Sequence, residues 1–212
     1  MKKLKVGVII SGGGSNLQVL IDACKLTGFP AEIIHVISNI PDAYGLTRAR
    51  NAGIATTVIN HKDYDTRESF DADINQVFID AGVEFICCAG FMRIMTDTLI
   101  NSWPDRMINI HPSLLPKYKG LHTHQRALNA GDSHHGCTVH YVRVELDDGP
   151  LIVQASVPVL EGDDTDKLAK RVLKQEHTIY PIALKLIAEN RVIIKDNIAF
   201  VDGKIGPLII SA

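Results

Sequence analysis

The sequence predicts an α/β fold built on a doubly wound, mostly parallel sheet with a C-terminal helix and hairpin, on the strength of three observations. Short apolar runs alternate with segments of helical spacing through the first half of the chain. A glycine-rich turn stands between the first strand and the first helix. A long helical segment near the C-terminus precedes two short β-prone runs. Such alternation is typical of parallel βαβ units with right-handed crossovers.

The first half is expected to hold five strands. The first is an apolar run rich in β-branched residues, and it and the fifth are expected to be buried. The runs are 4–10, 31–37, 55–59, 85–89 and 107–110. Helical spacing indicates helices over 17–24, 41–50, 65–82 and 96–101. Asp65 has capping-box spacing to Glu68 and is expected to begin the third helix.

The second half predicts a helix at 123–130 and strands at 137–144 and 152–159, separated by an acidic turn at 145–150. A long helix is expected at 165–189, and Pro181 should kink or divide it. The runs 192–194 and 198–201 predict a closing hairpin. We see no internal repeat or Pro/Ser-rich linker, which favours one domain over residues 1–212.

Composition excludes several classes of protein. The chain of 212 residues is 46% hydrophobic and 22% charged, which is ordinary globular composition. Its formal net charge of -2 argues against a protein held mainly by nucleic-acid phosphates. No apolar run is long enough for a membrane span. Its four cysteines, without Cys-x-x-Cys, indicate buried free thiols, so we expect a soluble protein of a reducing compartment, the cytoplasm.

The chain appears organised around Asn109 and His111, which end the fifth strand just before two prolines break it. Residues at i and i+2 of a strand point to one face. An amide beside an imidazole can stabilise an oxyanion and move a proton, as acyl transfer requires. The alternative is a strand-end Asn that satisfies the turn backbone and a His packed against proline.

The glycine-rich turn, Ser11-Gly12-Gly13-Gly14-Ser15-Asn16, predicts an anion site at a helix N-terminus. Leu17 occupies the place of the third glycine of a dinucleotide fingerprint, and no Gly-Lys-Ser/Thr follows. The turn therefore suits a phosphomonoester held by Gly14, Ser15 and Asn16. A plain flexible βα turn is the alternative.

Other polar residues carry weaker signals. His122, His124, His134 and His135 could be metal ligands, but no partner stands at a metal-site spacing, so surface or turn positions are expected. Arg67 and Arg93 could meet an acidic substrate or simply be solvated. Glu176 and His177 interrupt an apolar helix face, which indicates either a site or an exposed stripe.

Along nearly its whole length the chain resembles the folate-dependent formyltransferase family. The most specific piece is Asn109-Ile110-His111-Pro112-Ser113-Leu114-Leu115-Pro116. Further matching pieces are 11–18, 89–94, 120–124, 145–150 and 175–181. The length is similar to that of the small, free-standing members, without the extra C-terminal domain of the initiator-tRNA enzymes or the extra N-terminal domain of the hydrolases. The resemblance implies a Rossmann-like formyltransferase fold.

The resemblance implies transfer of a formyl group from 10-formyltetrahydrofolate to the amine of N1-(5-phosphoribosyl)glycinamide, in de novo purine biosynthesis. It implies catalytic roles for Asn109, His111 and Asp147. Gly14, Ser15 and Asn16 would hold the ribonucleotide phosphate, with Glu176 near the sugar. The implied folate-binding residues are Arg67, Met92, Arg93, Ile94, Met95, Asn109, Arg143, Val144, Glu145, Leu146 and Asp147.

Two positions depart from the family pattern. Leu173 stands where relatives can carry a polar residue near the ribonucleotide. Asp148 replaces a glycine often found after the catalytic aspartate, which adds a second charge close to the site.

The chemistry of these residue types agrees with direct transfer through a tetrahedral intermediate. Asn109 and a cationic His111 can donate to the oxyanion, while Asp147 holds the ring and takes up the amine proton. No metal is expected, since the folate carries the activated group. The partners expected are small molecules, with no nucleic acid, no membrane, and a monomer or weak homodimer. The rivals are a nicotinamide-dependent oxidoreductase, opposed by Leu17, and a phosphosugar-binding protein without activity.

Overall fold

The computed structural model describes residues 2–211 and divides into two compact units, Met1–Ile108 and Asn109–Ala212. Strand β5 (Met107–His111) contains the boundary. The expectation of a single formyltransferase domain over 1–212 stays a prediction.

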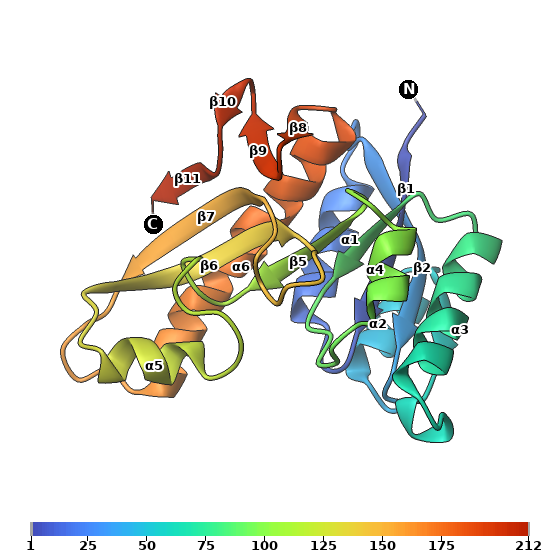
Figure 1. Ribbon diagram of the computed structural model, residues 1–212, viewed down its shortest axis with the longest axis horizontal. Helices are drawn as coiled ribbons and strands as arrows, with labels where there is room; N and C mark the ends of the chain where they lie inside the picture. The colour runs from blue at the N-terminus through green and yellow to red at the C-terminus, as the bar shows by residue number, and fades with distance from the viewer. Residues whose placement is uncertain (1, 212) are drawn as a thin grey trace. The chain divides into compact units, whose positions relative to one another are not determined.

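The first unit is an alternation of strands and helices (Figure 1). Its elements are β1 (Leu4–Ile10), α1 (Ser15–Lys25), β2 (Ala31–Ser38), α2 (Tyr44–Asn51), β3 (Ala55–Val58), the 3-10 turn η1 (His61–Asp63), α3 (Arg67–Asp80), β4 (Phe85–Cys88) and α4 (Asp97–Ser102). The strands run parallel in the order β4-β1-β2-β3. Helix α1 packs on α2, and α3 packs on α4.

Burial explains why the apolar runs of β1 and β4 become strands. All four residues of β4 are buried, as are the last five of β1. A parallel strand covered on both faces requires such continuous apolar sequence. Helix α3 presents Phe70, Ile74 and Phe78 to the core at the i, i+4, i+8 spacing of one helical face.

The second unit continues from β5 with α5 (Thr123–Asn129), β6 (His134–Tyr141), β7 (Leu151–Pro158), α6 (Thr165–Ala188), β8 (Val192–Lys195), β9 (Ile198–Val201), β10 (Lys204–Ile205) and β11 (Leu208–Ser211). Strand β7 pairs antiparallel with β6 and parallel with β11. Strands β8, β9 and β10 form a separate antiparallel sheet. Helix α6 packs on β6 and β7. The predicted α/β class, with its mostly parallel pairing, C-terminal helix and hairpin, is confirmed.

Some predicted boundaries are wrong. Strand β6 covers 134–141 instead of 137–144, because pairing with β7 sets its ends. Gly136 permits this pairing, since a Cβ there would lie 1.9 Å from the Ala155 carbonyl oxygen. Helix α2 begins at Tyr44, after a turn in which Ala43 N donates to Ile40 O.

Two predicted helix features are also corrected. The N-cap of α3 is Thr66, whose hydroxyl accepts from Ser69 N at 3.1 Å, and not Asp65. Pro181 does not divide α6, which runs without a break from Thr165 to Ala188. The buried face of this helix includes Val172, Ile179 and Leu184, and that burial outweighs the hydrogen bond that proline cannot make. Strands β10 and β11 were not predicted.

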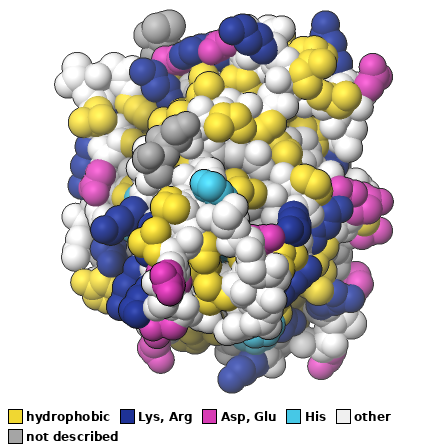
Figure 2. Space-filling model, turned by 90° about the vertical axis from the view of Figure 1, so that its left-hand side faces the viewer, with side chains coloured by type: hydrophobic (Ala, Val, Ile, Leu, Met, Phe, Trp, Pro, Cys, Tyr) yellow, Lys and Arg dark blue, Asp and Glu magenta, His cyan; other side chains and the backbone are white. Residues whose placement is uncertain are grey.

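The surface in Figure 2 mixes Lys and Arg with Asp and Glu over the face it shows. This distribution agrees with the small formal net charge of -2. Among residues 2–211, no helix combines the length and the apolar character that crossing a bilayer would need.

Candidate active site

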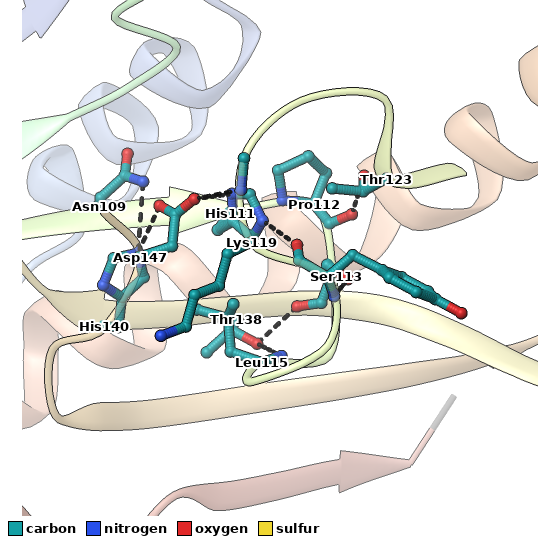
Figure 3. Close-up of polar contacts among 12 residues, drawn as sticks. Asn109, His111, Pro112, Ser113, Leu115, Lys119, Thr123, Thr138, His140 and Asp147 are labelled. Atoms are coloured by element: carbon teal, nitrogen blue, oxygen red, sulfur yellow. Dashed lines mark hydrogen bonds and ion pairs between the residues drawn. The ribbon is translucent and has the colours of Figure 1, made fainter. Parts of the chain in front are cut away.

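The candidate site is built on β5, where Asn109 and His111 lie two residues apart (Figure 3). His111 is buried, with 6% of its surface exposed. Its Nε2 lies 2.8 Å from the backbone oxygen of Tyr118. Because a carbonyl oxygen can only accept, this ring nitrogen carries a hydrogen and donates.

Asp147 faces the other nitrogen of the same ring. Its Oδ2 lies 3.4 Å from His111 Nδ1 and accepts from Gly120 N at 2.8 Å, and the side chain is 8% exposed. Its backbone is left-handed, with φ 51°, a conformation that Asp tolerates better than most residues. His111 thus faces an acceptor oxygen at each nitrogen. The ring can donate to both only as a cation.

His140 on β6 is a third member of this cluster, and the sequence analysis missed its role. Its Nδ1 lies 2.9 Å from the Tyr141 carbonyl oxygen, and its Nε2 lies 3.3 Å from Asn109 Nδ2. Burial lowers the pKa of His140 to about 4, against weaker opposing effects of the Tyr141 carbonyl and Asp147. A neutral ring that donates from Nδ1 must accept at Nε2, so it accepts from the Asn109 amide.

Asp147 Oδ1 also lies 3.6 Å from His140 Nε2, which is within ion-pair distance. Because the lowered pKa keeps His140 neutral, we assign no ion pair there. One sequence signal could have singled out His140. It is a titratable residue inside a run that otherwise predicts a buried strand.

The loop after β5 is held in shape by Ser113. This fully buried serine donates to Lys117 O and accepts from Tyr118 N, both at 2.6 Å. Thr138 Oγ1 of β6 donates to Ser113 O at 2.6 Å. These bonds fix the loop that supplies the Tyr118 carbonyl to His111.

Asp148, next to Asp147, belongs to the surface. It is 53% exposed and pairs with the ammonium of Lys119. The extra charge that departs from the family pattern is therefore matched by a cation of the same unit.

In the first unit, the glycine turn is held through its backbone carbonyls. Gly12 O accepts from Gly45 N at 3.0 Å, and Gly13 O accepts from Arg48 Nε at 2.8 Å. Gly14 has φ 68°, and a Cβ there would lie 2.6 Å from Gly45 Cα. Helix α1 therefore begins at a turn that only glycine fits, and no side chain caps it. The sequence analysis missed Arg48 as an anchor of this turn.

The remaining predicted residues of the first unit occupy two places. Arg67 is the exposed first residue of α3. Met92, Arg93, Ile94 and Met95 lie in the loop after β4, where Met92 is 68% and Ile94 64% exposed.

In the second unit, the loop after β6 carries Arg143, Val144, Glu145 and Leu146 immediately before Asp147. Arg143 Nε donates to Asn197 Oδ1 at 2.9 Å. Glu176 is buried in α6 and lines a cavity of about 480 Å³. Pro112, which follows His111 in the chain, and Leu173 line the same cavity.

The candidate histidines for metal binding are only partly on the surface. His122 and His134 are exposed, as expected, but His135 is buried in β6, which corrects that expectation. His124 Nδ1 lies 3.1 Å from His135 Nε2, and burial lowers the pKa of His135 to about 4. Within residues 2–211 no three His, Cys, Asp or Glu side chains form a group that could hold a metal ion.

Comparison with known families and structures agrees with this site. Residues 4–184 match the formyl transferase family. The chain belongs to that family.

Its relatives include the phosphoribosylglycinamide formyltransferase of Escherichia coli, 46% identical over 201 residues, which make up 95% of each chain. A trifunctional purine biosynthetic protein adenosine-3 from Chironomus tentans is 50% identical over 92% of this chain, which spans 14% of that protein. The crystal structure of phosphoribosylglycinamide formyltransferase from Coxiella burnetii has a TM-score of 0.92 and 43% identity, with 98% of this chain and 99% of that chain covered.

Proposed function

We propose that this protein transfers a formyl group from 10-formyltetrahydrofolate to the amine of N1-(5-phosphoribosyl)glycinamide, a step of de novo purine biosynthesis. The observation that carries the proposal is the buried cluster of Asn109, His111 and Asp147 on a chain of the formyl transferase family. Two relatives named phosphoribosylglycinamide formyltransferase, which are similar to this chain over nearly its full length, support the proposal.

The catalytic step is attack of the substrate amine on the formyl carbon, which gives a tetrahedral intermediate. Its collapse breaks the bond between that carbon and N10 of the folate, and N10 takes up a proton as tetrahydrofolate leaves. The developing oxyanion needs preorganised donors, and such donors typically contribute the largest single part of acyl-transfer catalysis. As a cation His111 can supply one from Nδ1, which lies 3.4 Å from Asp147 Oδ2, while its Nε2 donates to the Tyr118 carbonyl. Asp147 holds that cation and takes up the proton that the amine loses.

Asn109 supplies the second donor. Its Nδ2 carries two hydrogens, and the 3.3 Å contact uses one of them toward His140. The other remains for the oxyanion. We assign His140 a positioning role, because it fixes the direction of the Asn109 amide without meeting the substrate.

The ribonucleotide phosphate is assigned to Gly14, Ser15 and Asn16. An uncapped helix N-terminus attracts anions through its N–H groups and its dipole, and α1 has no side-chain cap. Glu176, buried in a cavity wall, is assigned to the sugar hydroxyls, since a carboxylate is a strong acceptor.

The folate is assigned to two loops and one arginine. Arg67 would bind a carboxylate of its glutamate tail, as guanidinium groups do with bidentate geometry. Met92 to Met95 and Arg143 to Asp147 would bind the pterin, and the exposed side chains of Met92, Ile94 and Leu146 offer apolar surface to a flat ring. The proposal requires no metal, because the formyl group arrives activated on the folate.

The rival activities fit the site less well. A dinucleotide-binding turn needs a third glycine, but Leu17 stands in its place and is fully buried in the core. A phosphosugar-binding protein without activity would not need the buried His111–Asp147 pair or the Asn109 amide that His140 orients.

The test mixes the protein with glycinamide ribonucleotide and 10-formyltetrahydrofolate and follows the absorbance of the folate product. We expect turnover that depends on both substrates. Reactions that lack either substrate, and a reaction with Asp147→Asn, are the controls. Absence of turnover in the unmodified protein would refute the proposal.

We also propose a cytoplasmic location, which the free thiols of Cys24, Cys87, Cys88 and Cys137 support. A monomer or weak homodimer remains our expectation for the oligomeric state.

A further inference from the structure

Ser11 follows β1 as the first residue of the glycine turn, and it contacts the segment that follows β4. Its backbone N donates to Gly90 O at 3.1 Å. Its hydroxyl oxygen accepts from Met92 N at 2.9 Å. Two hydrogen bonds therefore join the start of the proposed phosphate turn to the start of the proposed pterin segment.

The direction of the hydroxyl bond is fixed by Asn39. Ser11 Oγ donates its single hydrogen to Asn39 Oδ1 at 2.6 Å, which leaves the oxygen lone pairs for the amide of Met92. Asn39 is 2% exposed, and its Nδ2 lies 3.1 Å from His61 Nδ1. A buried group that is held on both sides orients the hydroxyl of Ser11 and leaves it little freedom.

The segment Met92–Met95 itself has neither helical nor strand structure. Its far end is anchored separately, because Thr96 N donates to Asp71 Oδ2 at 2.6 Å. Ser11 is thus the anchor of the end nearest the glycine turn. The turn in its own right is held by Gly45 and Arg48, which do not involve Ser11.

We propose that Ser11 is a positioning residue that holds the amide of Met92 and so couples ribonucleotide binding at the glycine turn to folate binding at Met92–Met95. The inference rests on the proposed function for the identity of the two ligands. Anion binding further stabilises this arrangement of the turn, in which Ser11 holds Met92, so the pterin meets a segment already in place. Coupling between two binding sites is reciprocal, so each ligand must tighten the other by the same factor.

The experiment is a calorimetric titration with glycinamide ribonucleotide and tetrahydrofolate, which lacks the formyl group and cannot react. Each ligand is titrated alone and in the presence of the other. In the unmodified protein we expect each ligand to lower the Kd of the other. In Ser11→Ala the factor by which one ligand lowers the Kd of the other should fall to about one, which means no coupling. The Kd of tetrahydrofolate alone should rise about fivefold, as expected for one lost hydrogen bond.

Three controls separate positioning from general loosening of the fold. Ser11→Thr keeps the hydroxyl and should restore the coupling. Ser38→Ala removes a more deeply buried hydroxyl at the end of β2, which bonds only locally to the Ile40 backbone in the contacts described, and it should leave the coupling intact. Amide hydrogen exchange at Met92 should quicken in Ser11→Ala alone.

The outcomes are distinguishable. If the unmodified protein binds neither ligand, the proposed function fails and the inference fails with it. If it binds both but Ser11→Ala leaves the coupling unchanged, or Ser38→Ala abolishes it equally, the inference alone is overturned.

Discussion

The glycine turn and the histidine cluster achieve their geometry by different means. The turn is local and made of backbone, since the carbonyls of Gly12 and Gly13 are held by α2 and Gly14 alone fits the left-handed position. The cluster is made of side chains that the chain collects from β5, β6 and the loop after β6. A backbone site should fail through lost stability when it is altered, whereas a side-chain site should fail through lost chemistry while the fold survives.

The cluster should give the largest effect, in Asp147→Asn. Asparagine also tolerates the left-handed backbone, at φ 51°, so the shape should survive while the charge is lost. Because general acid–base groups typically contribute roughly 10²–10⁴-fold, kcat should fall by at least that order. Steady-state kinetics measures the loss, and an unchanged unfolding midpoint shows that the fold is intact. A fall in kcat below about tenfold would remove Asp147 from the proton-transfer step.

The turn should respond differently, in Gly14→Ala. The new Cβ would lie 2.6 Å from Gly45 Cα, and φ is 68°. The left-handed conformation and the overpacking together should lower the free energy of unfolding by about 3 kcal/mol. Gly13→Ala is the matched control, because a Cβ there meets nothing within 4 Å. Denaturant unfolding of both variants measures the difference, and equal midpoints would contradict the account of the turn.

Acid should affect the unit that contains the cluster and not the turn, because the turn from Ser11 to Asn16 contains no titratable side chain whereas that unit buries His135 and His140. Burial lowers the pKa of both His135 and His140 from 6.5 to about 4. Between pH 4 and pH 6.5 these two histidines bind more protons in the unfolded chain than in the folded chain. The stability is thus complete above about pH 6.5 and declines as the pH falls toward 4.

Each of these two histidines can account for roughly 2–3 kcal/mol of that decline. Denaturant unfolding at a series of pH values measures it. His135→Gln removes one titrating group and should flatten the profile. A profile that is unchanged by this substitution would show that His135 is not buried in its neutral form.

His140→Val tests whether the orientation of the Asn109 amide by itself affects kcat. The variant keeps a buried apolar group but removes the acceptor 3.3 Å from Asn109 Nδ2. Misplacement of one donor by about 1 Å can cost up to about 10²-fold, so kcat should fall roughly 10- to 100-fold while KM for both substrates changes little. His140→Gln offers another acceptor and should recover part of the loss. Equal kcat values for His140→Val and the unmodified protein would exclude the positioning role.

The same contrast explains what could be predicted from the sequence. The glycine turn, its strand and its helix lie in one stretch of chain, so local conformational rules indicated them. Asn109 and His111 were found for the same reason, since they share one face of one strand. A local signal marks His140 only as a titratable residue in a buried strand. Its role was missed because it depends on Asn109, which is 31 residues away in sequence. Arg48 was missed because its partner, the carbonyl of Gly13, is 35 residues away in sequence.

Element ends were predicted poorly where pairing decides them. Strand β6 starts three residues before the apolar run, since β7 pairs with His134 and His135. Pro181 was expected to kink or divide α6, but it does not divide the helix, because packing on β6 and β7 outweighs a local preference. Tertiary contacts therefore overrode local rules at both places.

The smallest expected effect is that of Asp148→Asn, which sharpens the comparison within the cluster itself. Asp147 and Asp148 are adjacent, yet the first is 8% exposed beside His111 and the second is 53% exposed beside Lys119. Exposed ion pairs contribute about 0–1 kcal/mol, and salt screens exposed charges that lie more than about 10 Å apart. We therefore expect kcat to change by less than about tenfold in Asp148→Asn, and the difference should shrink further at high salt. Lys119→Gln removes the other member of the pair and should behave alike, since neither side chain touches His111 in the contacts described. If kcat fell further in Asp148→Asn than in Asp147→Asn, burial beside His111 would not explain which aspartate is catalytic. The proton-transfer role would then have to be assigned to the exposed Asp148–Lys119 pair.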